Sequence, residues 1–368
     1  MSIPKTCKGA VLVEFGKPLE IIDIEIPATG AGEILVKNHL SGICGSDVHQ
    51  AEFGLSTSWY PLPMLMGHEG LGEIVELGEG RTVDINGEEL HIGDRIMWTS
   101  YECGECYWCK SVKNGIFCAD KVFYGFEHPS KLMGHFAEYT HITAPTQVVK
   151  VPEVLTDAEV VGCACAGRSV FRGLELLGQI HANDTVVVQG CGPIGLFATV
   201  AAHASLAGQI IVIGAPADRL ELAKEWGATH TIDLDVYKDP EERKRMVYEW
   251  TNGRGAEIVI EASGFAPAFA EGVELCKMGG KYLMLGITNL NKIQFAPGLI
   301  LSRCIDIIGS RAAFIENYDQ ALKFILKHRN DYPFEKLVTN QYRLEDINQA
   351  LAGMKAGTEI KPVIDFSL

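Results

Sequence analysis

The sequence predicts two domains, with a doubly wound α/β domain inserted into an irregular β domain. Three observations predict this. The length of 368 residues exceeds the usual size of one domain. Residues 1–150 carry short β-like runs between glycine turns, and from about residue 156 strands alternate with helices. We therefore expect one domain at 1–155 and 311–368, and a second at 156–310.

The β-like runs of the first 150 residues have the length of single strands, and helical periodicity is nearly absent among them. These runs read AVLVEF, EIIDIEI, EILVKN, GEIVELG and GDRIMW. The chain ends in another such run, KPVIDF. Both ends of the chain are therefore expected to build the irregular β domain.

The middle of the chain alternates strands and helices. Thr185–Gln189 is a buried strand, followed by a glycine turn and a helix from Ile194 to about Ala207. A second strand, Gln209–Ile213, precedes a helix over Asp218–Trp226. Further strands are expected at Ala256–Glu261, Lys281–Leu285 and Ile305–Gly309. This alternation is typical of a parallel sheet with helices on both faces.

The charge excludes some classes of partner. Lys and Arg number 32 against 47 Asp and Glu, which gives a net charge of −15. Such a chain repels phosphate backbones and anionic bilayers, so neither nucleic acid nor a membrane is expected as a partner. The sequence also lacks a signal-peptide pattern and an apolar run of about 18 residues. We therefore expect a cytoplasmic protein.

The strand Thr185–Gln189 leads directly into a glycine-rich turn that opens a helix, Gly190-Cys191-Gly192-Pro193-Ile194-Gly195. In the spacing GxGxxG the first glycine permits the tight turn, and the second allows the backbone to approach a pyrophosphate. The third glycine lets the helix pack on the strand. The helix N-terminus also attracts a diphosphate. This context predicts a dinucleotide site.

The sequence leaves open whether the cofactor is NAD or NADP. An acidic residue at the end of the second strand would select NAD, but Gly214 and Ala215 occupy that place. Asp218 belongs to the next helix, and Arg219 lies within reach of a 2′-phosphate. Four further residues that follow later strands are also expected to bind the cofactor: Gly286, Ile287, Ser310 and Arg311.

Four of the eleven cysteines form a compact motif, Cys103-x2-Cys106-x2-Cys109-x8-Cys118. Four thiolates at this spacing suit a closed, tetrahedral zinc site. Because no coordination position remains free, this zinc is expected to be structural, with a binding free energy of about 10 kcal/mol that fixes the loop.

A second group of metal-ligating residues is dispersed over three stretches, GICGSDVH, GHEG and CACAG. Taken singly, a histidine such as His68 or a cysteine such as Cys163 is more often an ordinary packed residue. Together Cys44, His68 and one of Cys163 and Cys165 offer two thiolates and an imidazole. Three protein ligands leave one position open, as catalysis requires.

The chain resembles the zinc-dependent, medium-chain alcohol and polyol dehydrogenase family nearly end to end. The segments that carry the resemblance are GICGSDVH, GHEGLGEIVELGEG, GDRIMW, the four-cysteine motif, GHFAEY, CAGRSVF and VVVQGCGPIG. It implies a Rossmann domain inserted into a GroES-like catalytic domain, two zinc ions and NAD or NADP. It further implies a homodimer or homotetramer.

The resemblance also implies roles for single residues. Cys44, His68 and Cys165 match the ligands of a catalytic zinc, with Cys163 as the near alternative. The four-cysteine motif matches the structural zinc. Glu69 matches a carboxylate beside the metal, and Ser46 matches a hydroxyl that contacts the reacting oxygen. His49 matches the end of a proton relay. Asp47 matches a hydrogen-bond partner of the His68 ring.

Several departures from the family pattern bear on the substrate. Many polyol-type relatives have glutamate as the third ligand, so a cysteine puts a polyol substrate in doubt. Arg168 stands where relatives have a neutral residue; it is either a solvated or paired helix arginine or a cation for an anionic group. Phe53 and Trp59 form an apolar pocket wall or simply pack in their loop.

The expected reaction is hydride transfer between a secondary alcohol, or the corresponding ketone, and NAD(P). A bound zinc ionises the hydroxyl, which side-chain bases alone do not achieve. One alternative is a quinone or enoyl reductase of the same fold without a catalytic zinc. Another is a non-catalytic zinc-ribbon binding protein.

Overall fold

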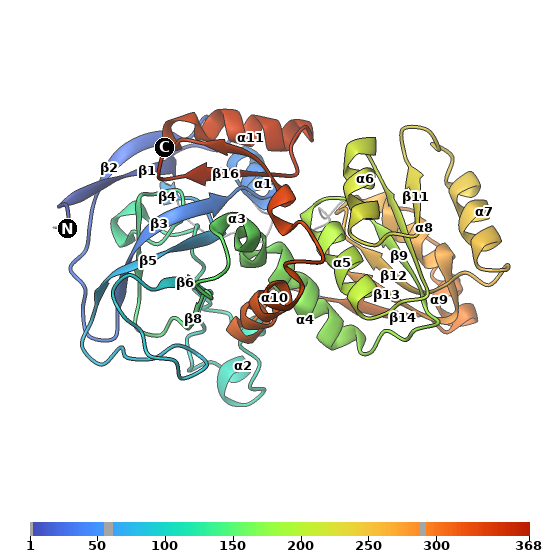
Figure 1. Cartoon of the computed structure of the whole chain (residues 1–368), viewed down its shortest axis with the longest axis horizontal. Helices are drawn as coiled ribbons and strands as arrows, with labels where there is room; N and C mark the ends of the chain where they lie inside the picture. The colour runs from blue at the N-terminus through green and yellow to red at the C-terminus, as the bar shows by residue number, and fades with distance from the viewer. Residues whose placement is uncertain (1–2, 55–61, 287–291) are drawn as a thin grey trace. The chain divides into compact units, whose positions relative to one another are not determined.

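The computed structural model describes residues 3–54, 62–286 and 292–368. The chain divides into two compact units, unit 1 with Met1–Arg168 and Ala313–Leu368, and unit 2 with Ser169–Ala312 (Figure 1). The first boundary lies within α4 (Ala166–Leu177) and not at the expected residue 155, because α3 (Asp157–Val160) and η3 (Val161–Ala164) pack on β3 of unit 1.

Two sheets build unit 1. The smaller sheet has the strand order β2-β1-β4, and the larger has the order β15-β16-β3-β5-β6-β8, with β7 paired to β3. The strands are β1 (Thr6–Leu12), β2 (Glu20–Glu25), β3 (Ile34–Gly42), β4 (Met64–Leu65), β5 (Gly70–Leu77), β6 (Arg95–Trp98), β7 (Tyr139–Ile142), β8 (Val148–Lys150), β15 (Val338–Tyr342) and β16 (Lys361–Asp365). The C-terminal strand β16 thus pairs with β3, as a domain built from both chain ends requires.

Apolar strand residues fill the interior of unit 1. Ile34 and Val36 of β3 pack with Ile74 of β5 and Ile96 of β6, and all four are fully buried. A neighbouring cluster joins Ala10 and Leu12 of β1 to Ile364 of β16 and to residues of α11 (Ile347–Ala356). The other long helix of this unit is α10 (Ile315–His328). These contacts hold the loops at the strand ends in fixed positions.

The expectation that unit 1 lacks helices in its first 150 residues is wrong at one important place. Residues Gly45–Phe53 form the helix α1, which starts directly after Cys44. Its sequence GSDVHQAEF has too few apolar residues to show helical periodicity. The Asp47 carboxylate instead accepts a hydrogen bond from the Cys44 backbone N–H at the start of the helix. Short helices also occur at α2 (Tyr107–Lys110), η1 (Gly115–Phe117) and η2 (Pro129–Lys131).

Unit 2 contains a six-stranded parallel sheet in the order β11-β10-β9-β12-β13-β14. The strands are β9 (Thr185–Gln189), β10 (Gln209–Gly214), β11 (His230–Asp233), β12 (Ala256–Glu261), β13 (Cys276–Met284) and β14 (Asp306–Gly309). The helices are α5 (Pro193–Ala204), α6 (Ala217–Glu225), α7 (Pro240–Trp250), α8 (Ala266–Leu275) and α9 (Gly298–Arg303). The doubly wound fold is therefore confirmed, with the strand order reversing between β9 and β12.

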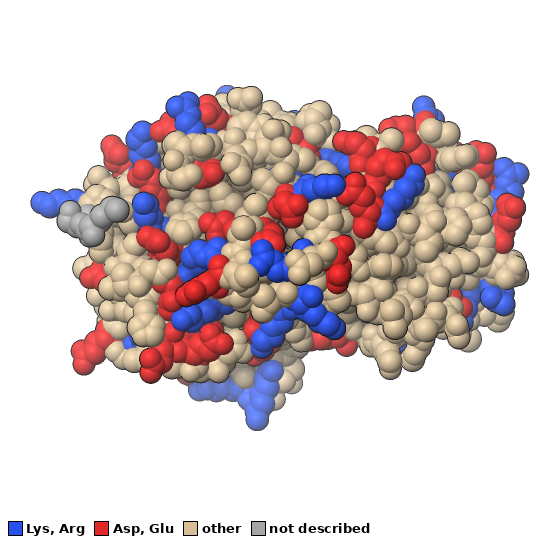
Figure 2. Space-filling view, in the orientation of Figure 1, with Lys and Arg blue, Asp and Glu red and all other residues tan. Residues whose placement is uncertain are grey.

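No helix among the described residues is long and apolar enough to cross a membrane. Figure 2 shows acidic side chains interspersed with basic ones over the visible face.

Candidate metal and dinucleotide sites

Three loops of unit 1 bring four metal-ligating side chains together. One ligand atom each from Cys44, His68, Glu69 and Cys165 lies within 4.8 Å of the others. Cys44 lies between β3 and α1, His68 and Glu69 lie between β4 and β5, and Cys165 lies between η3 and α4. Cys163, the alternative third ligand, is buried and outside this group. The structure therefore groups Cys165 with Cys44 and His68.

Asp47 connects two members of the cluster. Its Oδ1 lies 2.9 Å from Nδ1 of His68, and its Oδ2 accepts a hydrogen bond of 2.9 Å from the Cys44 backbone N–H. The carboxylate therefore leaves Nε2 of His68 to face the cluster. Ser46, in the same turn of α1, has its hydroxyl 3.7 Å from the Cys44 sulfur.

Glu69 is fully buried and paired with a lysine from the C-terminal strand. Lys361 Nζ, on β16, donates hydrogen bonds of 2.8 and 2.6 Å to the two carboxylate oxygens. A Cβ at Gly42 would lie 2.2 Å from the Glu69 carboxylate, so glycine is required there. The pair holds the carboxylate beside the cluster without exposing it to water.

Electrostatics within the cluster favour the ionised form of Cys44, whereas the hydrogen bond with Cys44, together with burial, raises the pKa of Cys165 well above its usual range. A hydrogen bond from Cys165 lowers the pKa of Cys44 well below its usual range, and the charges of His68 and Lys361 act in the same direction. Burial raises the pKa of Glu69, while the positive charge of Lys361 opposes this effect. A thiolate beside an imidazole and a carboxylate is a donor set that binds a divalent metal.

These donors fit zinc. Two sulfurs and one imidazole nitrogen form a three-ligand set that leaves one tetrahedral position for a reacting oxygen. Glu69 lies next to this set but is already held by Lys361. The cluster therefore suits an open zinc site in which Glu69 remains close to the metal position.

The four cysteines of the 103–118 loop form the second candidate metal site. Sulfur–sulfur distances are 3.5 Å for Cys106–Cys109 and Cys103–Cys118, and 3.9 Å for Cys106–Cys118. A tetrahedron with Zn–S bonds of about 2.3 Å has edges of about 3.8 Å. A hydrogen bond from the Cys109 backbone N–H lowers the pKa of Cys106 to about 6. The loop is therefore shaped to hold zinc with all four positions filled.

The glycine-rich turn of unit 2 has the geometry that a dinucleotide requires. Gly190 has a φ of 108°, and a Cβ there would lie 2.9 Å from the Ser263 backbone nitrogen. A Cβ at Gly195 would lie 1.9 Å from the Gly190 carbonyl oxygen. Around Gly192, by contrast, a Cβ would meet open space. The N-terminus of α5 therefore remains open to a diphosphate.

An NAD-selecting carboxylate would lie at the end of β10. The thiol of Cys191 fills the space that a side chain at Gly214 would need. A Cβ at Gly214 would lie 2.4 Å from the Cys191 sulfur, and this thiol donates to the Ala215 carbonyl oxygen at 3.2 Å. Asp218 is exposed on α6, and its Oδ1 accepts from the Arg219 backbone N–H. No side chain extends from residue 214 toward a ribose.

Comparisons with known proteins place the chain in a family. The model of the alcohol dehydrogenase GroES-like domain matches residues 30–153, and that of the zinc-binding dehydrogenase matches residues 193–327. The chain is 36% identical to 5-exo-hydroxycamphor dehydrogenase of Pseudomonas putida over 98% of its own length and 99% of that protein. The chain belongs to the zinc-containing medium-chain alcohol/polyol dehydrogenase family.

Other relatives agree with this family assignment. Sorbitol dehydrogenase of Halalkalibacterium halodurans is 32% identical over 92% of this chain and 93% of that protein. The crystal structure of an alcohol dehydrogenase from Thermotoga maritima has a TM-score of 0.90 at 32% identity, covering 98% of this chain and 99% of that one. The chain is therefore an NAD(P)-dependent zinc alcohol/polyol dehydrogenase that acts on CH–OH donors.

The remaining residues predicted to form the site differ in their position and in their exposure to solvent. His49 lies on α1 and is half-buried, whereas the Phe53 ring at the end of that helix is 77% exposed. Gly286 lies against Glu261 at the end of β12, Ser310 follows β14 and donates its N–H to Met284, and Arg311 is exposed. Trp59 and Ile287 lie outside the described residues.

Arg168 is partly buried, and no ion pair with a carboxylate is found for it among the described residues. Its guanidinium lies 5.1 Å from the centroid of the Tyr318 ring, and it also interacts with the Cys165 thiol. Sequence reasoning missed Tyr318 and Lys361 entirely. Both come from distant segments, and no local motif marks either of them.

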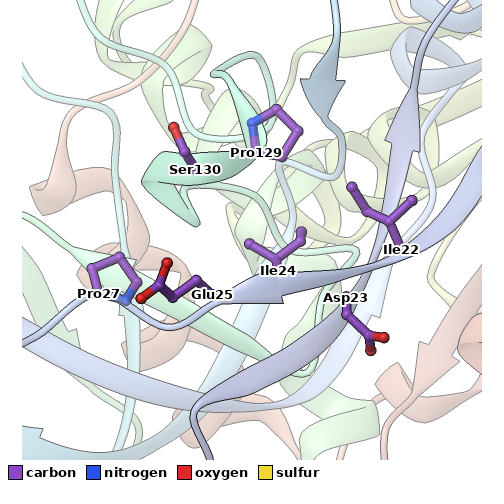
Figure 3. A pocket seen from close by; sticks show the side chains of 7 residues that line it. All are labelled: Ile22, Asp23, Ile24, Glu25, Pro27, Pro129 and Ser130. Atoms are coloured by element: carbon purple, nitrogen blue, oxygen red, sulfur yellow. The ribbon is translucent and has the colours of Figure 1, made fainter.

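A separate hollow of about 440 Å³ lies in unit 1 between β2 and η2 (Figure 3). Two carboxylates, Asp23 and Glu25, belong to its lining together with isoleucine, proline and serine side chains. None of the clustered cysteines or His68 lines it. This hollow is therefore not the metal site.

Proposed function

We propose that this dehydrogenase oxidises a secondary alcohol to a ketone, and reduces the ketone in reverse, with zinc held by Cys44, His68 and Cys165. The observation that carries the proposal is the convergence of these three side chains, from three loops, to within 4.8 Å of one another. A quinone or enoyl reductase without a catalytic zinc does not need this convergence.

The side chains around the cluster have distinct tasks in this proposal. When bound, the zinc acts as a Lewis acid that lowers the pKa of the substrate hydroxyl, as it lowers that of water from about 15.7 to about 7. Ser46 contacts the reacting oxygen and accepts its proton while releasing its own hydroxyl proton into the relay, and His49, at the end of the relay, passes a proton to solvent. Asp47 holds the His68 ring, and Glu69 remains close enough to exchange with substrate or water.

The two units have different functions in this proposal. Unit 1 holds both zinc sites and the proton path, and unit 2 binds NAD or NADP through the turn at 190–195. We also propose a homodimer or homotetramer. Two features of unit 2 support assembly: β14 is the edge strand of the parallel sheet, and Leu301 on α9 is 82% exposed.

A secondary alcohol on a ring is the proposed substrate class. The relative with 36% identity is named for hydroxycamphor, which carries its hydroxyl on a ring carbon. Sorbitol, named for the relative with 32% identity, is the competing choice. A thiolate at Cys165, where many polyol-type relatives have a glutamate, favours the ring alcohol.

The test compares cyclohexanol, 1-hexanol and sorbitol with NAD⁺ and NADP⁺ separately, and counts zinc on the same sample. We expect the highest kcat/KM with cyclohexanol, two zinc ions per chain, and one zinc in Cys44→Ser with no turnover. Equal activity of Cys44→Ser and the wild type would contradict the metal role. A wild-type chain with only one zinc would favour the reductase.

A further inference from the structure

Arg168 is a partly buried cation close to Cys165, the third candidate zinc ligand. It is the third residue of α4 and follows Cys165 by one turn. Its interactions with Tyr318, Cys165 and Glu69 raise its pKa although burial lowers it. Its Nε is buried and has no hydrogen-bond partner among the described residues. A partly buried guanidinium with a buried, unpartnered Nε carries a desolvation cost that its surroundings must offset.

The guanidinium of Arg168 lies over the ring of Tyr318. The ring belongs to α10, is 3% exposed, and its hydroxyl interacts with Thr99. Because the guanidinium lies 5.1 Å from the ring centroid, a cation–π contact fixes it over the ring. Arg168 therefore has a restrained position, unlike an arginine on an exposed helix face.

Cys165 needs such support because neither neighbouring helix includes it. It lies between η3 and α4, with φ −135° and ψ −62°, so helical hydrogen bonding does not set its orientation. Arg168, in the first turn of α4, interacts electrostatically with the Cys165 thiol. The arginine is therefore placed to restrain the side chain of a ligand whose backbone is not helical.

The balance of charges around the metal position is a second reason for a positive charge at position 168. Two thiolates, Glu69 and Asp47 place four negative charges in a largely buried volume. A divalent ion, Lys361 and Arg168 together supply four positive charges. With a neutral side chain at position 168, one negative charge would remain unbalanced in a region of low dielectric constant.

We propose that Arg168 is a positioning residue of the catalytic zinc site. Stacked on Tyr318, it holds the Cys165 sulfur in its ligating position and balances the charge of the second thiolate. This inference rests on the proposed function, because it takes Cys44, His68 and Cys165 as the zinc ligands. Arg168 does not touch the substrate.

The experiment measures zinc binding rather than turnover alone. Arg168→Met, Arg168→Lys, Tyr318→Leu and Tyr318→Phe are challenged with a chelator, and zinc per chain is determined. Cobalt-substituted samples report the thiolate-to-metal charge-transfer absorption. The zinc of the four-cysteine loop is an internal reference. Arg172→Met is the matched control, because Arg172 lies one turn further along α4 and pairs with Glu175.

Arg168→Met is expected to weaken zinc binding at the catalytic site by about 10- to 100-fold and to change the charge-transfer band. Tyr318→Leu shifts both readouts in the same direction, whereas Tyr318→Phe keeps the ring and stays near the wild type. Arg168→Lys restores part of the affinity. Arg172→Met leaves both readouts unchanged.

Wild-type or tighter zinc binding in Arg168→Met, with an unchanged cobalt spectrum, would overturn the proposal. A raised KM with unchanged zinc binding would overturn it too, because it would place Arg168 on an anionic substrate. If Arg168→Met does not fold, the zinc affinity and the cobalt spectrum of Arg168→Lys and Tyr318→Leu test the proposal instead. A wild-type chain that binds only the zinc of the four-cysteine loop would instead refute the proposed function.

Discussion

Asp47 contacts two candidate ligands of the same metal through its two carboxylate oxygens. One oxygen lies 2.9 Å from Nδ1 of His68, and the other accepts the backbone N–H of Cys44 at 2.9 Å. A single side chain therefore sets the orientation of the imidazole and the start of the helix that follows Cys44. Because the carboxylate is 2% exposed, water does not replace these hydrogen bonds easily.

Asp47→Asn is expected to lower kcat and zinc affinity by about 10- to 100-fold, because an amide orients the His68 ring less strongly and adds no charge. The measurements are steady-state kinetics and zinc content after dialysis. Asp331→Asn is the matched control, since that carboxylate also lies 2.9 Å from a histidine Nδ1, at the exposed pair with His328. Equal losses in both variants would contradict a specific role for Asp47.

Lys361→Met is expected to destabilise unit 1 by about 3–5 kcal/mol, because it leaves the buried Glu69 without a counter-charge. Thermal or urea unfolding measures this change. Lys8→Met breaks an exposed pair with Glu345, where water screens the charges, and should cost much less stability than Lys361→Met. The double variant Lys361→Met, Glu69→Gln should recover part of the loss. No recovery would show that Lys361 acts through packing alone.

The central strands could be predicted from the sequence because local composition determines them. β9 and β12 have the predicted bounds, and both are runs of buried apolar residues. β13 begins five residues before the expected Lys281, because its first residues, Cys276–Gly280, contain two glycines and no continuous apolar run. Helix α1 was missed, since a side-chain hydrogen bond at its first turn, and no apolar stripe, marks it.

The metal cluster could be predicted only in part. The four-cysteine motif is local, and its spacing alone indicates the site. Lys361, by contrast, is 292 residues from Glu69 in the chain, so no spacing rule relates them. The choice between Cys163 and Cys165 depends on the turn between η3 and α4, which decides which sulfur faces Cys44. Tertiary contacts determine these features.

The stability of unit 1 is expected to depend on pH through His39. A hydrogen bond of 2.9 Å that His39 Nδ1 donates to the Asp157 carboxylate raises the pKa of His39 above its unfolded value of about 6.5. Protonated His39 therefore contributes stability that is complete below about pH 6.5 and is lost as the pH rises through the raised pKa. In His39→Gln this contribution is absent at every pH.

Thermal unfolding midpoints between about pH 5 and pH 8 test this prediction. The difference between the wild type and His39→Gln should be largest at the acid end and should shrink toward the alkaline end. Burial tends to raise the pKa of Asp157, but its hydrogen bonds with His39 and Arg95 lower it. The carboxylate thus stays ionised across this range. A difference that grows with rising pH would have the wrong sign for the proposed linkage.

Packing between Cys191 and Gly214 is expected to control any change of cofactor preference. A Cβ at position 214 would lie 2.4 Å from the Cys191 sulfur, so Gly214→Asp alone should destabilise unit 2 by about 1–3 kcal/mol through overpacking. Cys191→Gly removes the obstacle. The double variant Cys191→Gly, Gly214→Asp should then present a carboxylate to the ribose and repel a 2′-phosphate.

The measured quantity is the ratio of kcat/KM with NADP⁺ to that with NAD⁺. The double variant should lower this ratio by at least about tenfold, the effect of a free-energy difference of about 1.4 kcal/mol. Cys191→Gly alone is the matched control, because it opens the same space without adding a charge. If both variants gave the same ratio, the side chain at 214 would not face the ribose, and selection would reside elsewhere at the end of β10.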